Sequence, residues 1–410
     1  MVREYKDSGI TWIGSIPKEW KTERIKALFS ERNERDCQGK TLLSVSRYFG
    51  IRPKSETDLA DSHIAESYDD YKEVRKGDFV MNIMLAWNGS YAVSDYDGIV
   101  SPAYCVFKFR KDCCKKYFHY LLSTDGYPSA FKTMSRGVID SRLRLYPEQF
   151  YTFPVIIPSV DEQQRIADYL DKKCAEIDGL IELQEQMIAQ LTDYKQSVIT
   201  EAVTKGLNNK NKLVPSGIDW IEEIPEGWMV CRIKDLVNLQ SGTNLTTMEI
   251  SDNGTYPVYG GNGLRGYYEE YSNDGEYILI GRQGALCGNI NYASGKFWAT
   301  EHAVVCYPKR EFAKKWLGEL LRTMNLGQYS LSAAQPGLSV ERIKNLKMPL
   351  PSLFEQQIIA SYLDSKCSEI DNLIAVKQQK IETLKEYKKS LIFECVTGKK
   401  EINYLWIGVS

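Results

Sequence analysis

Long apolar runs, CxxC motifs and metal-binding spacings are all missing from this chain of 410 residues. No stretch of about 18 consecutive apolar residues occurs, so we expect no membrane-spanning helix. The ten cysteines form no CxxC pair and share no ligand spacing with His63, His119 or His302. We therefore expect reduced, mostly buried thiols and no metal site. The charged segment Met1 to Asp7 lacks the apolar stretch of a signal peptide, which favours a cytoplasmic location.

Signatures of nucleotide chemistry are absent or incomplete. The chain has no Pro-Pro dipeptide, which excludes the Asn/Asp-Pro-Pro-aromatic loop of an amino-methyltransferase. The segment Gly39 to Thr41 has Glu34 where the first glycine of a phosphate-binding loop would stand. The segment Gly261 to Gly266 matches GxGxxG, but the tyrosine-rich residues after it open no helix. We interpret that segment as a glycine-rich turn or a loop near DNA rather than a dinucleotide site.

Charge is distributed unevenly along an otherwise ordinary globular composition. Hydrophobic residues make up 43% of the chain and charged residues 26%, with a net charge of −2. Residues 101–144 nevertheless hold nine basic and three acidic side chains, and residues 309–347 hold eight and three. Such local excess suits two phosphate-facing surfaces better than nonspecific coating of nucleic acid. A solvated surface with fluctuating charge would give the same counts.

The dominant feature of the sequence is a tandem duplication. A first signature, Trp-Ile-x-x-Ile-Pro-x-x-Trp, occurs at Trp12 to Trp20 and again at Trp220 to Trp228. A second, Pro-Ser-x-x-Glu-Gln-Gln, occurs at Pro158 to Gln164 and at Pro351 to Gln357, and roughly half of the next fifty positions are identical. The offset is 208 at the first signature (225 minus 17) and 193 at the second (351 minus 158). The middle segments, which we cannot align, predict two different recognition surfaces on one repeated scaffold.

A long amphipathic helix is predicted after each copy of the second signature. Apolar residues recur there at steps of three, four and seven, and no proline interrupts them. Each helix should have some 44 residues and a length of about 65 Å, ending at Gly206 and Gly398. Because a narrow apolar stripe needs a partner, we expect the two helices to pair, most simply antiparallel. The stripe comprises Ile166, Leu170, Ile177, Ile181, Ile188, Leu191 and Val198, and then Ile359, Leu363, Ile370, Ile374, Ile381, Leu384 and Leu391.

The middle segments are predicted to be mixed α+β domains. Each contains short β-branched and aromatic runs separated by turn residues such as Asn88-Gly89, followed by a short helical pattern. The predicted strands cover residues 79–83, 104–109, 277–281 and 303–307, and the predicted helices cover residues 113–124 and 311–325.

With both signatures present twice and in the same order, the chain resembles the specificity subunit of Type I restriction–modification systems. The resemblance spans nearly the whole chain. It implies two target recognition domains that each read one half of a bipartite, asymmetric site in double-stranded DNA, and an antiparallel helical spacer that fixes the distance between the halves. It also implies that two methyltransferase subunits dock on the helices and that restriction subunits join this core. S-adenosylmethionine, ATP and Mg would belong to those partners, and this chain would not be an enzyme.

The expected fold class is therefore α+β, with two globular mixed α/β target recognition domains separated by two long helices that form an antiparallel coiled-coil spacer. The expected domains are residues 1–157 and 207–350, the helices residues 158–206 and 351–400, and the tail residues 401–410. Pairing of the helices and docking of partners are assigned to Ile177, Ile181, Ile188, Leu191, Ile370, Ile374, Ile381 and Leu384.

Base reading requires Arg, Lys, Asn, Gln and hydroxyl side chains on polar loops, with aromatics and glycines that permit close approach. In the first domain we expect contacts from Ser46, Arg47, Tyr48, Asn82, Trp87, Asn88 and Arg136, with Arg142 and Arg144 on phosphates. In the second we expect them from Tyr259, Gly260, Asn262, Arg265, Arg282, Gln283, Glu301, His302 and Gln335. The repeated Trp12, Trp20, Trp220 and Trp228 are interpreted as core anchors instead.

Two other classes of function remain open from the residues alone. A standalone nuclease or methyltransferase would transfer methyl groups to DNA, or cleave it, as the purified chain. A coiled-coil scaffold without a DNA role would retain no DNA in a sequence-dependent way even with partner subunits supplied.

Overall fold

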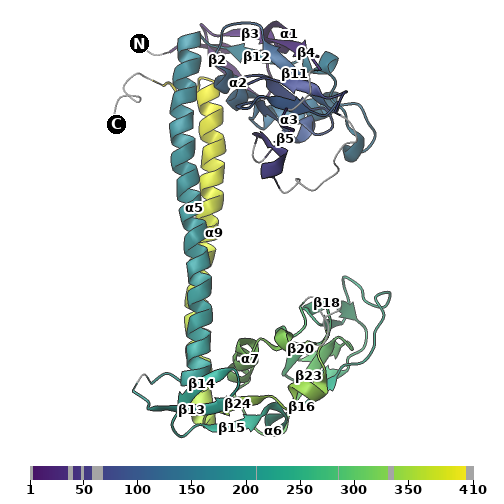
Figure 1. The fold of residues 1–410 in the computed structure, drawn as a ribbon, viewed down its shortest axis with the longest axis vertical. Helices are drawn as coiled ribbons and strands as arrows, with labels where there is room; N and C mark the ends of the chain where they lie inside the picture. Colours follow the sequence, from purple (N-terminus) through teal and green to yellow (C-terminus); the bar gives the residue numbers. More distant parts are fainter. Residues whose placement is uncertain are drawn as a thin grey trace. The chain divides into compact units, whose positions relative to one another are not determined.

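The computed structural model describes residues 3–35, 40–47, 50–57, 68–208, 210–284, 286–330 and 337–402. The chain divides into two compact units, Met1–Leu183 with Gln379–Ser410 and Gln184–Gln378. Each unit holds one mixed α/β domain and part of each of two long helices (Figure 1). Among the described residues, no helix is both long and apolar enough to cross a bilayer.

The first domain is built on a four-stranded antiparallel sheet in the order β4-β11-β8-β9. These strands are Phe29–Arg32, Tyr104–Phe109, Phe79–Asn82 and Tyr91–Val93, so the predicted strands at 79–83 and 104–109 are confirmed. Smaller antiparallel pairs join β1 (Tyr5–Asp7) to β2 (Ser15–Pro17), β3 (Lys21–Arg24) to β12 (Pro154–Ile157), β5 (Leu43–Ser46) to β6 (Gly50–Pro53), and β7 (Lys72–Val74) to β10 (Gly98–Val100). The helices are α1 (Ile25–Leu28), α2 (Lys115–Leu122), α3 (Gly126–Met134) and α4 (Pro147–Phe150), with 3-10 turns η1 (Lys54–Glu56), η2 (Ala86–Asn88) and η3 (Asp140–Arg142).

Aromatic rings fill the core under this sheet. Phe29, Phe79 and Phe107 come from three neighbouring strands, and Phe150 of α4 packs on all three with ring centroids 5.1–6.0 Å apart. All four side chains are fully buried. Burial of rings of this size dominates core energetics, so the phenylalanines hold the sheet and α4 as one body.

The second domain has a sheet of the same form, in the order β16-β23-β20-β21. Its strands are Val237–Ser241, Ala303–Pro308, Tyr277–Gly281 and Ile290–Ala293, which confirms the predicted strands at 277–281 and 303–307. A second sheet has the order β18 (Gly263–Tyr268), β17 (Tyr256–Gly260), β22 (Lys296–Ala299) and β19 (Asn273–Asp274). The other elements are the pairs β13 (Leu213–Ile218) with β14 (Ile221–Pro225) and β15 (Met229–Arg232) with β24 (Lys347–Leu350), and α6 (Ile233–Leu236), α7 (Lys314–Thr323), η4 (Leu326–Tyr329) and α8 (Val340–Ile343).

The two domains share a framework that the sequence does not reveal. In each, the strand after the short first helix pairs with the last strand of the sheet, which pairs in turn with the second strand. Individual hydrogen bonds also correspond between the two domains. The backbone N–H of Ile25 donates to Phe153 O at 2.8 Å, and that of Ile233 donates to Leu346 O at 3.1 Å. The domains differ in what is added: two short strand pairs in the first and a four-stranded second sheet in the second.

The two long helices are α5 (Val160–Lys205) and α9 (Leu353–Val396), and they pack antiparallel (Figure 1). At 1.5 Å per residue, the 46 residues of α5 span about 69 Å. Gly206 and Gly398 follow the helix ends at φ +75° and +72°, in the left-handed conformation that the sequence predicts there. All eight apolar residues assigned to helix pairing are buried or half-buried: Ile177, Ile181, Ile188, Leu191, Ile370, Ile374, Ile381 and Leu384.

The two sequence signatures meet in space within each unit. The indole N–H of Trp20 donates to Glu162 Oε2 at 2.8 Å, and that of Trp228 donates to Glu355 Oε2 at 3.0 Å. The next residue, Gln163 in one copy, bridges two backbone groups, since its amide donates to Pro158 O and accepts from Cys114 N–H. Gln356 makes the corresponding pair of bonds. Trp20 is fully buried and its three counterparts are half-buried, in keeping with a role as core anchors.

Candidate nucleic-acid interface

Four of the residues predicted to contact DNA line one pocket of the first domain. Ser46 ends β5 and Arg47 follows it, and Trp87 and Asn88 belong to the turn η2. The pocket has a volume of about 750 Å³ and is also bordered by α2, α3 and α9. Strand, turn and helix residues from distant parts of the sequence therefore meet at one concave surface.

Three of the side chains at this pocket, those of Arg47, Trp87 and Asn88, have defined local contacts. Arg47 lies over Gly89, where an added Cβ would be 3.7 Å from the Arg47 Cγ atom. The indole N–H of Trp87 donates to Met84 O at 3.0 Å, and the Lys132 ammonium lies 4.9 Å from the Trp87 ring centroid. Asn88 Oδ1 accepts from the Ser90 hydroxyl at 2.8 Å, which leaves its amide N–H₂ available.

One predicted residue of this domain, Asn82, does not line the pocket. Asn82 is buried in β8, where its Oδ1 accepts from Met84 N–H at 2.9 Å, so its oxygen is used within the fold. Tyr48 lies outside the described residues.

The predicted phosphate contacts lie on a closed loop between α3 and α4. Arg136 and Arg144 exchange two backbone hydrogen bonds of 2.9 Å, which close the loop. The Arg136 and Arg142 side chains are exposed and make no ion pair with any described residue. The acidic residue of the loop, Asp140, is paired with Lys132 at 2.8 Å. At the tip, Val138 is 98% exposed. The loop thus presents free guanidinium groups around an aliphatic tip.

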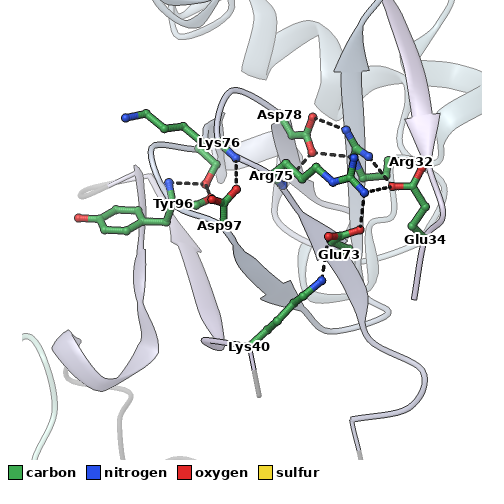
Figure 2. Close-up of polar contacts among 10 residues, drawn as sticks. Arg32, Glu34, Lys40, Glu73, Arg75, Lys76, Asp78, Tyr96 and Asp97 are labelled. Carbon is green, nitrogen blue, oxygen red and sulfur yellow. Dashed lines mark hydrogen bonds and ion pairs between the residues drawn. The ribbon is translucent and has the colours of Figure 1, made fainter. Parts of the chain in front are cut away.

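Three other cations of the first domain, Arg32, Lys40 and Arg75, are held in ion pairs. Arg32 pairs with the buried Asp78 at 2.7 Å, and Glu73 pairs with Lys40 at 2.8 Å and with Arg75 at 3.1 Å (Figure 2). Hydrogen bonds from Arg75 and Lys40 lower the pKa of Glu73 to about 2. This network ties β4 to the segment that contains β7 and the turn before β8. We assign it to stability and not to DNA contact.

In the second domain the predicted residues gather where three strands end. Arg282 follows β20, and its backbone N–H donates to His302 O at 2.8 Å. Its guanidinium donates to Ser241 Oγ at the end of β16, at 3.2 Å. Gly261 lies against the same backbone, since an added Cβ would be 3.1 Å from Gln283 O and 3.2 Å from His302 O. The fold therefore brings the segments at 261, 282 and 302 together.

Several buried polar atoms in this cluster have no hydrogen-bond partner among the described residues. His302 Nε2 lies 3.0 Å from Glu301 Oε1. The other polar atoms of both side chains, His302 Nδ1 and Glu301 Oε2, are buried without a hydrogen-bond partner among the described residues, as is Asn291 Nδ2. Buried polar atoms without partners are rare in proteins, and a ligand is one explanation for them.

The other predicted residues of the second domain surround this cluster. Asn262 is exposed and accepts from Asn289 Nδ2 at 3.2 Å, and the exposed Arg265 lies over Gly260. Tyr259 is half-buried with its ring against Phe297 at 5.6 Å. Gln335 lies outside the described residues. The GxGxxG segment forms the hairpin between β17 and β18, which confirms that it opens no helix.

Sequence reasoning missed several residues of both sites. His119, Lys132 and Lys389 line the pocket of the first domain, and Asn289 and Asn291 border the cluster of the second. None of them adjoins a predicted residue in sequence. Only the charge excess of residues 101–144 pointed towards Lys132.

Metal and disulfide chemistry find no support in the described part of the chain. No group of three or more His, Cys, Asp or Glu side chains there is placed to hold a metal ion. The nine described cysteines are all free thiols, and six of them are buried. Burial raises the pKa of the six buried thiols, and that of Cys306 to about 12, so these thiols are poor nucleophiles and ligands.

Comparison with known families identifies both halves of the chain. A family model described as "Type I restriction modification DNA specificity domain" matches residues 17–193 and again residues 225–386. The EcoprrI specificity subunit of Escherichia coli is 43% identical over 134 residues, which are 32% of this chain and 33% of that relative. The MjaVIII specificity subunit of Methanocaldococcus jannaschii is 23% identical over 431 residues, which cover 95% of each chain.

A solved structure that is described as the structural basis of complex assembly and conformational transition of the type I R-M system has the same fold. It covers 94% of this chain and 99% of its own, with a TM-score of 0.72 at 15% sequence identity. The two domains and the antiparallel pair of long helices are thus the fold of a solved protein, even where the sequences have diverged.

Proposed function

Because the chain belongs to the Type I restriction modification DNA specificity family, we propose that its two target recognition domains read different halves of one bipartite, asymmetric DNA site. As a specificity subunit, the chain recognises the DNA target and directs the modification and restriction subunits. It is the non-catalytic component, and the cofactors of the system belong to those other subunits. What remains to be assigned is which surfaces read DNA and which bind protein.

The observation that carries the proposal is a common framework with two different polar sites. The first domain presents the pocket around Arg47 and the loop closed by Arg136 and Arg144, here called the arginine loop. The second domain presents the cluster around Arg282 and His302. Arg, Asn, Gln and His side chains on loops are the groups that recognise base edges and phosphates. Two different surfaces on a common framework therefore read two different half-sites of the DNA.

The long helices also offer a surface to protein partners. Beside the buried row, a second row of apolar residues stays exposed, and each member of α5 has a counterpart in α9 that is 193 residues later. These pairs are Leu180 with Leu373, Leu183 with Val376, and Tyr194 with Tyr387, all between 46% and 66% exposed. Exposed apolar rows of this kind mark protein interaction sites. Since the row occurs twice, we propose that it receives two copies of the modification subunit, with the restriction subunits joining that assembly.

Mapping of methylated sites tests the proposal. The chain is produced together with Type I modification subunits, and single-molecule sequencing locates the methylated bases in host DNA. We expect two short defined blocks separated by a gap of fixed length and undefined sequence. A single uninterrupted block would contradict two readers, and methylation by the chain alone would contradict a non-catalytic role.

A further inference from the structure

The pocket of the first domain receives a side chain from the long helix α9 as well as from the domain itself. Lys389 lines it together with Arg47, Arg52, Lys132 and Asp125. Four cationic side chains thus face one carboxylate. The pKa of Lys389 is raised first by its hydrogen bond to Glu386 and then by the charge of Asp125, and the charge of Arg47 opposes this shift. A pocket with this balance of charge suits an anion.

The cations differ in how far they are already paired. Lys132 is bound to Asp140 and Lys389 to Glu386, at 2.8 and 3.0 Å, whereas Arg47 has no hydrogen bond or ion pair with a described residue. Glu386 lies on the same exposed face of α9 as Lys389, so this ion pair is screened by water and weak. Arg47 and Lys389 are therefore two cations that can turn to a ligand at low cost.

A buried polar atom in the wall of the pocket also lacks a partner. His119 lines the pocket, and its Nδ1 is buried with no hydrogen-bond partner in the described part of the chain. Burial lowers the pKa of His119, so the ring is neutral near pH 7. A neutral ring in this position leaves the positive charge of the pocket to the arginines and lysines.

The group that fits is a phosphate and not a stacked base. Tyr91 and Trp87 both line the pocket, but the Tyr91 side chain is buried. Lys132 lies over the Trp87 ring, and the indole N–H of Trp87 already donates to Met84 O. Guanidinium and ammonium groups, by contrast, are the usual ligands of phosphate oxygens.

We propose that this pocket holds one phosphodiester group of the target DNA backbone, between Arg47 of the recognition domain and Lys389 of helix α9. The long helix is then a DNA contact as well as a spacer. The inference rests on the proposed function, because it assumes that the first domain faces target DNA.

The repeat supplies a natural comparison for Lys389. Subtracting the offset of 193 places Gln196 of α5 at the equivalent position, so the other helix already carries a neutral amide there. The exchange Lys389→Gln is consequently compatible with this helix. A matched control is Lys385→Gln, because Lys385 pairs with Glu382 at 3.0 Å just as Lys389 pairs with Glu386, yet it does not line the pocket.

The test measures binding of the specificity–modification complex to a labelled duplex that contains its methylated-site sequence, over a series of KCl concentrations. Loss of one phosphate contact lowers the slope of log K against log salt by about 0.9. We expect that change for Lys389→Gln and for Arg47→Gln, and no change for Lys385→Gln. The preference for the target over a duplex altered in either half should be the same in all three variants.

Three outcomes would overturn the inference. If the complex binds its bipartite site and Lys389→Gln keeps the wild-type slope, the proposed function stands and the phosphate contact is wrong. If inorganic phosphate or a deoxynucleotide competes at the pocket of the DNA-free complex, and the competition is lost in Lys389→Gln, the site serves a free anion instead. If no bipartite site is bound by the wild-type complex, the proposed function itself fails.

Discussion

The ammonium group of Lys195 in α5 lies 2.7 Å from the carboxylate of Asp371 in α9. Moving along the sequence by the repeat offset gives the reciprocal pair, because Asp178 of α5 binds Lys388 of α9 at the same distance. Lys195 and Lys388 are equivalent residues of the two copies, and so are Asp178 and Asp371. Each helix therefore contributes the same lysine and the same aspartate to the two ion pairs. That reciprocity is the signature of two-fold pairing, here between two copies of one element within a single chain.

Buried isoleucines, more than these ion pairs, should stabilise the helix pair. Lys195 and Asp371 are 28% and 56% exposed, and pairs of this kind contribute about 0–1 kcal/mol. Ile370 is 2% exposed, and truncation of such a residue costs about 2–5 kcal/mol. We expect Ile370→Ala to lower the free energy of unfolding in urea severalfold more than Lys195→Ala. Equal losses would show that the charged pair, and not the seam, carries the interface.

The two glycines that end the long helices should differ in their tolerance of alanine. A left-handed conformation costs a non-glycine residue about 1–2 kcal/mol, and this cost applies to both. A Cβ at Gly398 would also lie 2.5 Å from the Pro17 ring, whereas at Gly206 the nearest atom is a Glu355 side-chain oxygen at 3.1 Å. Gly398→Ala should therefore lower the melting temperature more than Gly206→Ala does. The reverse order would contradict the packing of the end of α9 on Pro17.

The Glu73 network should make stability depend on acid pH. Arg75 and Lys40 lower the pKa of Glu73 from 4.5 to about 2, so the folded state holds this carboxylate ionised more readily than the unfolded state does. By linkage, the stabilisation is fully present above pH 4.5 and is lost as the pH falls towards 2. Urea unfolding of the wild type and of Glu73→Gln should differ most near pH 6 and converge as the pH falls below 4.5. A difference that is constant with pH would rule out the charge as its source.

The arginine loop should add affinity without adding sequence preference. Arg142 is exposed and has no ion-pair partner among the described residues, and a phosphate contact from it carries no base information. We expect Arg142→Ala to weaken binding of all duplexes alike and to reduce the salt slope by about 0.9. Lys18→Ala, which removes an exposed lysine paired with Glu4, is the control and should leave binding unchanged. A change of preferred sequence in Arg142→Ala would assign the residue to base reading.

The sequence predicts the repeated parts of the fold well, because periodicity and helix-ending glycines are local signals. The helices α5 and α9, their ends at Gly206 and Gly398, and the strands β8, β11, β20 and β23 all follow from such signals. The common framework of the two domains does not follow from local signals, because a strand pairing such as β4 with β11 depends on residues more than 70 positions apart. A sheet accepts many apolar side chains at each position, so its topology persists after the identities of the residues are lost.

The binding surfaces were predictable only in part for the same reason. Polar residues at strand ends and turns, such as Arg47, Asn88 and Arg282, can be chosen by type and local setting. Lys389 and His119 cannot, because they lie in helices that look ordinary in sequence and reach the pocket only through tertiary packing. The predicted roles of the individual DNA-contact residues remain predictions.

Exchange of one middle segment tests the central claim, that each domain reads its own half of the target. Residues 30–150 are replaced by the corresponding segment of a relative with a different specificity, and the complex with modification subunits is assayed by sequencing of methylated sites. The account predicts that one block of the bipartite site changes while the other block and the gap between them stay the same. A change in both blocks, or in neither, would contradict it.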